Sequence, residues 1–260
     1  MMTEVLLQES LPEQITLSAI KPSRNLLRLT GKAIGDHQMI REGDRVLIGL
    51  SGGKDSFSLL MTLRELQRKA PIRFDLGVVT IDPQSPEFDP SSLKDSIPTL
   101  DIPYFYESYP IVEQAKTSMK GDSFCAFCSR MRRGLMYKVA RREGYNVLAL
   151  AQHLDDLAET FLMSALYGGK LRTMQAHYTN DAGDLRIIRP FIYVREKQTR
   201  DFAIRHALPI IPENCPACFG KPTERYHMKQ VLGQLEQSNT KVFNNLLTAM
   251  RPLMTVQASI

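Results

Sequence analysis

The sequence lacks long apolar runs and internal repeats, and it has only four cysteines among 260 residues. No apolar stretch approaches the roughly 18 residues that a membrane-spanning helix needs, so we expect no membrane partner. The first four residues lack the basic and then apolar pattern of a secretory signal, and we therefore expect a cytoplasmic location. Hydrophobic residues make up 43% of the chain, which predicts a globular protein with a full core.

The positive charge of the chain is concentrated in two segments. The net charge is +5, which favours an anionic partner. Aromatic residues are not interleaved with the basic ones, so these segments predict contact with a phosphate backbone rather than stacking on bases. A solvated helix face is the alternative. The first segment holds Arg130, Arg132, Arg133, Lys138, Arg141 and Arg142, and the second holds Arg186, Arg189, Arg195, Lys197 and Arg200.

Apolar strands and amphipathic helices alternate along most of the chain. Candidate strands cover residues 45–50, 74–81, 103–107 and 147–151, and candidate helices cover residues 56–69, 92–100, 129–144 and 155–167. This alternation predicts an α/β fold in which helices cover both faces of a parallel sheet. We expect a helical N-terminal segment (1–40), an α/β domain (41–212), and a cysteine turn with C-terminal helices (213–260).

Residues 46–56 carry the clearest functional signal. An apolar strand is followed by a glycine-rich turn and then by a second apolar run that predicts a helix. Gly52 and Gly53 allow backbone N–H groups to face an anion, and the start of a helix adds unpaired donors and its dipole. Lys54 adds a positive charge. The segment therefore predicts a phosphate-binding loop, the alternative being an ordinary strand-to-helix turn.

The loop does not fit the Walker pattern, because Ile48 and Asp55 stand where that pattern requires Gly and Ser or Thr. Its sequence, SGGKDS, resembles the pyrophosphate loop of the PP-loop ATPases, which cleave ATP between the α and β phosphates. The resemblance implies the PP-loop version of the α/β fold. It also implies that the ATP-binding residues are Ser51, Gly52, Gly53, Lys54, Asp55 and Ser56.

Polar residues follow two further candidate strands. Ligands of an open parallel sheet bind at the carboxyl ends of its strands, so we expect Asp82, His153, Asp155 and Asp156 to share a crevice with the loop. His153 is a candidate phosphate contact, and Asp155 or Asp156 is a candidate ligand of Mg²⁺. The alternative is that Asp155 caps a helix and His153 is a satisfied polar residue. QHLDDLAETF resembles the second PP-loop motif, GHxxDD followed by ET, with Gln152 where Gly is usual.

All four cysteines lie in two CxxC pairs, Cys125 with Cys128 and Cys215 with Cys218. In a cytosolic chain this pairing indicates metal binding rather than structural disulfides. A tetrahedral zinc site with four thiolates, a thioredoxin-like redox pair and an iron–sulfur cluster all remain open at this point.

Four segments together resemble the tRNA 2-thiocytidine synthetase family, a PP-loop group. They are FCAFCSRMRRGLMY, HLDDLAETFLMSALYGGKLRTM, IIRPFIYVREK and PIIPENCPACFGKP, within a likeness that runs from about residue 25 to residue 250. The resemblance implies a [4Fe–4S] cluster held by three cysteines, with one iron left open to take sulfide. The matching positions are Cys125, Cys128 and Cys218, with Cys215 as the alternative to Cys218. The family usually reads CxLCGSQ where this chain reads CPACFGKP.

The resemblance implies an ATP-dependent, AMP-forming sulfurtransferase that modifies tRNA. Such an enzyme adenylates a cytidine carbonyl oxygen in the anticodon loop, and sulfur then displaces AMP to give 2-thiocytidine. The candidate catalytic residues are Lys54, Asp55 and Asp156, and the candidate tRNA contacts are Arg130, Arg132 and Arg133. Expected partners are tRNA, a sulfur donor such as a cysteine desulfurase, and a second copy of the chain in a homodimer.

Two other functions stay open. One is a PP-loop adenylating enzyme with structural zinc that acts on another tRNA base or on a small molecule. The other is a tRNA-binding protein without catalytic activity, for which the SGGKDS loop would have no purpose.

Overall fold

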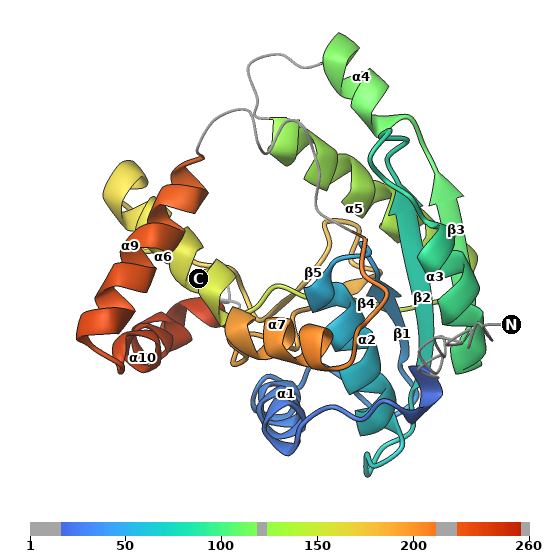
Figure 1. Cartoon of the computed structure of the whole chain (residues 1–260), viewed down its shortest axis with the longest axis horizontal. Helices are drawn as coiled ribbons and strands as arrows, with labels where there is room; N and C mark the ends of the chain where they lie inside the picture. The colour runs from blue at the N-terminus through green and yellow to red at the C-terminus, as the bar shows by residue number, and fades with distance from the viewer. Residues whose placement is uncertain (1–16, 119–123, 212–222, 256–260) are drawn as a thin grey trace, which may run out of the picture.

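The computed structural model describes residues 17–118, 124–211 and 223–255. Within them, six strands form one sheet in the order β3–β2–β1–β4–β6–β5 (Figure 1). The strands are β1 (Arg45–Gly49), β2 (Asp75–Asp82), β3 (Tyr104–Ser108), β4 (Val147–Ala149), β5 (His177–Thr179) and β6 (Arg186–Ile188). All neighbouring strands run parallel except β5, which pairs with β6 in the antiparallel direction.

The helices lie between and around these strands. Figure 1 shows α6, α9 and α10 gathered on the left of the molecule, away from β2 and β3. The described helices are η1 (Leu17–Ala19), α1 (Arg24–Asp36), α2 (Lys54–Gln67), α3 (Ser91–Ser96), η2 (Ile97–Leu100), α4 (Ile111–Ser118), α5 (Phe124–Arg142), α6 (Leu154–Gly168), α7 (Glu196–Arg205), α9 (Glu224–Ser238) and α10 (Val242–Met254).

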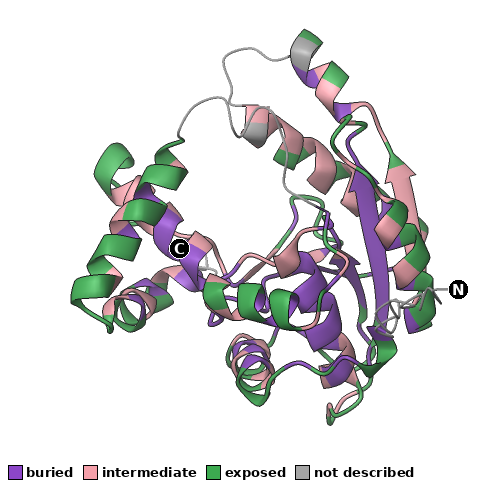
Figure 2. Cartoon of the chain, in the orientation of Figure 1, coloured by how far each residue is buried: buried purple, intermediate pink, exposed green. Residues whose placement is uncertain are grey.

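Two apolar clusters cover the two faces of the sheet. Successive side chains of a strand point to opposite faces, so Val46 and Ile48 of β1 join one cluster while Leu47 joins the other. The first cluster includes residues of α2, α6 and α10, and the second includes residues of α5. Figure 2 shows that β1, β2 and much of α2 are buried between these layers. The predicted α/β sheet with helices on both faces is therefore confirmed.

Several short elements were not predicted from the sequence. The strands β5 and β6 have three residues each, which is too short for a two-residue hydrophobic period to stand out. The expected helix over residues 92–100 is divided into α3 and η2, with Pro98 in the 3₁₀ segment.

The division of the chain into three segments remains a prediction. No described helix has both the length and the apolar character needed to cross a membrane.

A close contact between Gly77 of β2 and the ring of Tyr145 provides a test of this packing. A Cβ at Gly77 would lie 2.2 Å from the Tyr145 hydroxyl oxygen and 2.5 Å from Cζ. The Tyr145 ring is 5% exposed, and it lies edge-on to Phe105 and under the Arg45 guanidinium. We predict that Gly77→Ala lowers the free energy of unfolding in urea by about 1–3 kcal/mol, the usual cost of overpacking.

Gly233→Ala is the matched control, because a Cβ on this α9 residue meets nothing within 4 Å. Alanine is the better helix former, so this variant is expected to be as stable as the original chain or more stable by up to about 1 kcal/mol. A Gly77→Ala protein as stable as Gly233→Ala would contradict the packing described for Tyr145.

Candidate functional site

A cavity of about 270 Å³ opens at the carboxyl ends of β1, β2 and β4. The strand order reverses between β1 and β4, and open α/β sheets bind ligands at such a point. The cavity is lined by Gly49, Leu50, Ser51, Gly53, Asp55, Ser56, Val79, Ile81, Arg132, Met136, Leu150, Ala151, Gln152 and Asp156. The predicted loop and the predicted Asp156 therefore lie in one cavity.

The loop is held in shape by its own serines and by one glycine. Ser56 Oγ donates to the Gly53 carbonyl at 2.9 Å and accepts from the Ser51 backbone N–H at 3.2 Å. Gly52 has φ +88°, a conformation that favours glycine, and a Cβ there would lie 2.7 Å from Ile211 Cδ1. The Ile211 N–H also donates to the Gly52 carbonyl at 2.9 Å. The turn thus presents the start of α2 to the cavity.

Lys54 and Asp55 begin α2, and their side chains are 21% and 22% exposed. Lys54 Nζ lies 3.0 Å from Asp55 Oδ2 and 3.0 Å from Glu196 Oε1 of α7. Burial alone would lower the pKa of Lys54, but the two carboxylates outweigh it and raise that pKa well above its usual value. Lys54 is therefore a positive charge held in place at the start of α2, beside the turn that the sequence predicts to bind phosphate.

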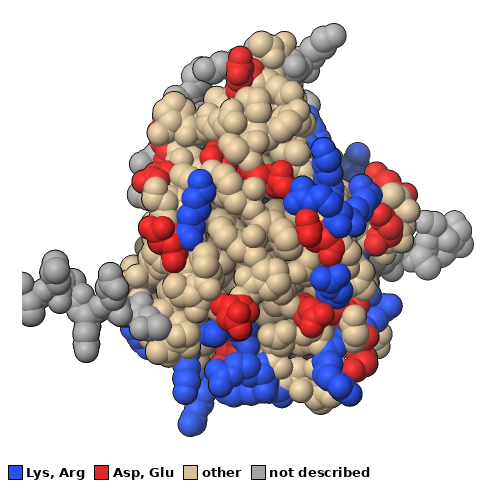
Figure 3. Space-filling view, turned by 90° about the vertical axis from the view of Figure 1, so that its right-hand side faces the viewer, with Lys and Arg blue, Asp and Glu red and all other residues tan. Residues whose placement is uncertain are grey.

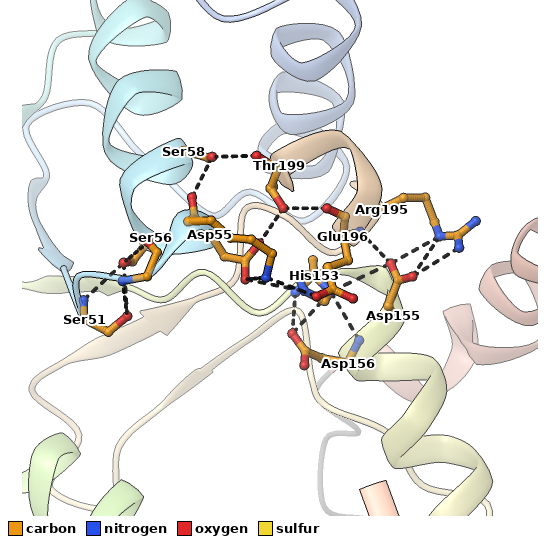
Figure 4. Close-up of polar contacts among 12 residues, drawn as sticks. Ser51, Asp55, Ser56, Ser58, His153, Asp155, Asp156, Arg195, Glu196 and Thr199 are labelled. Atoms are coloured by element: carbon orange, nitrogen blue, oxygen red, sulfur yellow. Dashed lines mark hydrogen bonds and ion pairs between the residues drawn. The ribbon is translucent and has the colours of Figure 1, made fainter. Parts of the chain in front are cut away.

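The second motif forms the start of α6. His153 is the N-cap, and its Nδ1 accepts from the Asp156 N–H at 3.4 Å while Asp156 Oδ2 accepts from the His153 N–H at 3.0 Å. His153 Nε2 lies 3.8 Å from Asp55 Oδ2, so the two motifs are in contact. Figure 4 shows Asp156 below His153 and apart from Asp155.

Asp155 faces a different set of partners. Arg195 Nε lies 3.1 Å from each Asp155 carboxylate oxygen, and the Glu196 N–H donates to Oδ2 at 2.8 Å. Arg195 also donates to Glu236 of α9 at 2.8 and 2.9 Å. Asp155 is thus engaged in an ion pair that joins α6, α7 and α9.

Asp82 lies at the carboxyl end of β2 but does not line the cavity. Its Oδ1 accepts from the Gln84 N–H at 2.7 Å, and its Oδ2 accepts from the Tyr106 hydroxyl. Val79 and Ile81 of the same strand do line the cavity.

Glu196 and Thr199 of α7 are functional-site residues that the sequence analysis missed. Thr199 Oγ1 donates to Asp55 Oδ1, and Glu196 holds Lys54 on one side and Lys229 Nζ at 2.6 Å on the other. Burial acts to raise the pKa of Glu196, but the contacts of its carboxylate with Lys229 and Lys54 outweigh burial and lower that pKa to about 2. The one sequence feature that could have identified Glu196 is that it is an acidic residue between two basic ones, Arg195 and Lys197.

Neighbouring arginines of helix α5 lie in different surroundings. Arg132 lines the loop cavity together with Met136, whereas Arg133 lines a second cavity and Arg130 is exposed. The Arg132 Nε atom is buried and has no hydrogen-bond partner among the described residues. Arg132 and Arg133 therefore face different cavities, and the role of all three arginines as tRNA contacts remains a prediction.

The predicted cluster ligands are only partly covered by the structure. Cys125 and Cys128 lie one turn apart in α5, and Cys128 is half-buried against the second apolar cluster. Because residues four apart share a helix face, Cys128 is on the face of Arg132 and Met136 that meets the loop cavity. Cys215 and Cys218 lie outside the described residues. No group of three or more potential metal ligands occurs among the residues that are described.

Comparison with known proteins agrees with this geometry. The PP-loop domain model matches residues 22–213. A tRNA-cytidine(32) 2-sulfurtransferase of Pelobacter propionicus is 39% identical over 230 residues, which cover 87% of this chain and 85% of that protein. The chain belongs to the tRNA 2-thiocytidine synthetase family of PP-loop proteins. The protein of the same name from Legionella pneumophila (strain Corby) is 39% identical over 90% of this chain and 83% of its own length.

A solved structure supports the fold. The U34-tRNA thiolase NcsA from Methanococcus maripaludis, solved with its [4Fe–4S] cluster, superposes with a TM-score of 0.73 at 19% identity. The match covers 90% of this chain and 79% of that protein.

Glu159, one turn after Asp155 in this PP-loop protein, is 3% exposed and accepts from Arg225 Nη1 of α9 at 3.0 Å. Burial is the largest effect on the pKa of Glu159, and the charge of Asp156 adds to it; together they raise this pKa to about 7 against the opposing charge of Arg225. Between pH 4.5, the usual pKa of a glutamate, and about pH 7, the folded protein holds a proton that the unfolded chain has released. The free energy of unfolding therefore falls as the pH rises through this window.

We predict that Glu159→Gln, which resembles the protonated side chain, removes most of this pH dependence. From pH 5 to pH 7.5 the variant should lose less stability in urea denaturation than the original chain, by on the order of 2 kcal/mol. Glu113→Gln, a change at an exposed residue of α4, is the control and should follow the original chain. Parallel pH profiles for the Glu159 variant and the original chain would refute the assignment.

Proposed function

We propose that this protein is an ATP-dependent tRNA-cytidine 2-sulfurtransferase that activates a cytidine carbonyl with AMP and replaces its oxygen with sulfur. The observation that carries the proposal is the shared cavity. It joins the SGGKDS loop, Asp156 of the second motif and the α5 face that follows the first CxxC pair. The curated relatives named tRNA-cytidine(32) 2-sulfurtransferase support cytidine in tRNA as the substrate.

ATP is assigned to the loop cavity. The first N–H groups of α2 have no partner within the helix, and they surround a turn of the size and charge that binds phosphates. Lys54 supplies charge beside them, and Arg132, which lines the cavity, supplies a second cation. These groups would stabilise the negative charge that develops when pyrophosphate leaves and AMP joins the substrate oxygen.

Mg²⁺ is assigned to Asp55 and Asp156, because both line the cavity and offer carboxylate oxygens of the kind that Mg²⁺ prefers. Asp155 is a less suitable ligand, since it is not among the residues that line the cavity and its carboxylate is paired with Arg195. His153, as the N-cap that fixes Asp156, would act by orienting that carboxylate.

The [4Fe–4S] cluster is assigned to Cys125, Cys128 and Cys218, with Cys215 as the alternative third ligand. The position of Cys128 fits the assignment, since its helix face leads directly to Arg132 and Met136 in the cavity wall. When bound, the cluster supplies an open iron that accepts sulfide, and Mg²⁺ supplies positive charge at the phosphates. A sulfur donor such as a cysteine desulfurase and a homodimeric state remain predictions.

Lys54→Ala tests the ATP assignment. With ATP, Mg²⁺, sulfide, a reductant and tRNA, the anaerobically purified protein should form 2-thiocytidine, measured by mass spectrometry of digested tRNA. The variant should lose at least about a hundredfold in rate, the effect of removing one preorganised charge-stabilising group. Lys69→Ala, at an exposed lysine just after α2, is the matched control and should keep the rate. A Lys54→Ala enzyme with an unchanged rate would show that the loop takes no part in the mechanism.

A deletion strain tests the substrate. Unchanged thionucleosides in its tRNA would refute tRNA thiolation.

Iron analysis of single cysteine variants tests the cluster assignment. Anaerobic preparations should contain close to four irons and four sulfides, as a [4Fe–4S] cluster requires. Cys125→Ala, Cys128→Ala and Cys218→Ala should each lose iron and the visible absorbance, whereas Cys215→Ala should keep most of both. Loss at Cys215 in place of Cys218 would exchange the third ligand. One zinc and no iron would instead support an adenylating enzyme with structural zinc.

A further inference from the structure

Arg189, just after β6, is a buried arginine whose described partners include no carboxylate. The residue is 6% exposed. Its Nη1 donates to the Gln175 carbonyl at 2.7 Å, and its Nε donates to Gln152 Oε1 at 3.2 Å. Its guanidinium carbon lies 5.3 Å from the centre of the Tyr178 ring. Neutral groups therefore hold a buried positive charge, which is unfavourable unless an anion joins it.

Other arginines of the two basic segments are paired with acids. Arg186 contacts Asp44, Arg195 contacts Asp155 and Glu236, Arg141 contacts Asp184, and Arg142 contacts Glu107. The molecular face in Figure 3 also shows acidic side chains beside most groups of basic ones. These four arginines are therefore parts of structural ion pairs, and Arg189 differs from them in having no carboxylate among its described partners.

Arg189 lines a second cavity, of about 540 Å³, which lies apart from the loop. Arg133 of α5 and Arg172 of the loop after α6 also line it, with Thr173, Gln175 and Tyr178. No Asp or Glu is found among the described residues of its lining. The charge of Arg133 lowers the pKa of Arg189, after the larger effect of burial, so the two cations are close enough to repel each other. Neither Arg133 nor Arg172 forms an ion pair with a described residue.

The second cavity shares a wall with the loop cavity. Gln152 lines the loop cavity, and its Oε1 accepts from Arg189. Arg132 and Arg133, which are adjacent in α5, point into the two cavities separately. An occupant of the second cavity would therefore lie next to the group that reacts at the loop.

We propose that this second cavity, lined by Arg133, Arg172 and Arg189, binds a backbone phosphate of the tRNA beside the nucleotide that enters the loop cavity. The proposal rests on the proposed function, because it takes RNA as the substrate. Guanidinium groups match the geometry of a phosphate and bind it through paired hydrogen bonds. The lining offers no carboxylate for Mg²⁺, so it suits a phosphodiester rather than a metal–nucleotide complex.

The test measures tRNA affinity by fluorescence anisotropy over a series of NaCl concentrations. Arg133→Ala and Arg172→Ala should each weaken tRNA binding about tenfold, the scale of one charge-assisted contact. Each should also reduce the slope of log Kd against log[NaCl] by about 0.7–0.9, as expected when one phosphate contact is lost. ATP affinity, measured by equilibrium dialysis, should stay within twofold.

Arg73→Ala is the matched control, because this exposed arginine precedes the amino end of β2, whereas Arg189 of the second cavity follows the carboxyl end of the parallel strand β6. It should leave tRNA affinity and salt slope unchanged. If the original chain thiolates tRNA but Arg133→Ala and Arg172→Ala bind it with unchanged affinity and slope, the cavity assignment is wrong while the proposed function stands. If the original chain thiolates no tRNA, the proposed function itself fails.

A further measurement distinguishes binding of RNA in this cavity from binding of a free anion. Inorganic phosphate and pyrophosphate are titrated into the original chain and both variants by calorimetry. Binding of these ions that the variants lose, together with unchanged tRNA affinity, would assign the cavity to a free anion and overturn the proposal. Weaker tRNA binding in the variants, with millimolar phosphate failing to displace tRNA, is the expected result.

Discussion

Lys54 lies between two carboxylates, and this contact connects the parts of the chain that build the site. Asp55 is its neighbour in sequence, but Glu196 comes from α7, and Glu196 in turn holds Lys229 of α9. Thr199, also on α7, donates to Asp55. The start of α2 is therefore fixed against α7 before any ligand binds. Because Lys54 and Glu196 stay charged, a phosphate bound as proposed would meet a cation whose position is already set by its partners.

The contacts of Glu196 and Thr199 with the start of α2 could not be predicted from the sequence. The SGGKDS turn and the start of α6 depend on neighbouring residues, since glycine conformation, N-capping and the first helical turn are local properties. They were predicted from the sequence. Contacts between Lys54 and Glu196 join residues more than a hundred positions apart, and no spacing rule identifies such pairs.

For the arginines of α5, the sequence predicted the helix but not the direction in which each side chain points. The sequence analysis treated Arg130, Arg132 and Arg133 as one tRNA-binding group, and that role remains a prediction. Successive residues of a helix are about 100° apart, so Arg132 and Arg133 face different cavities. The helix was predicted, but its rotation is set by packing: Val139 and Ala140 are buried against the sheet and fix which face meets the loop.

The two cavities differ in the chemistry of their charges, and this difference separates their roles. The loop cavity combines the cation Arg132 with the carboxylates Asp55 and Asp156. A polyphosphate that binds with Mg²⁺ needs both kinds of group, since carboxylates hold the metal and cations hold the phosphate oxygens. The second cavity has three arginines and no described carboxylate. A site of this composition binds an anion without a metal, and a phosphodiester of RNA, with its single charge, is such an anion.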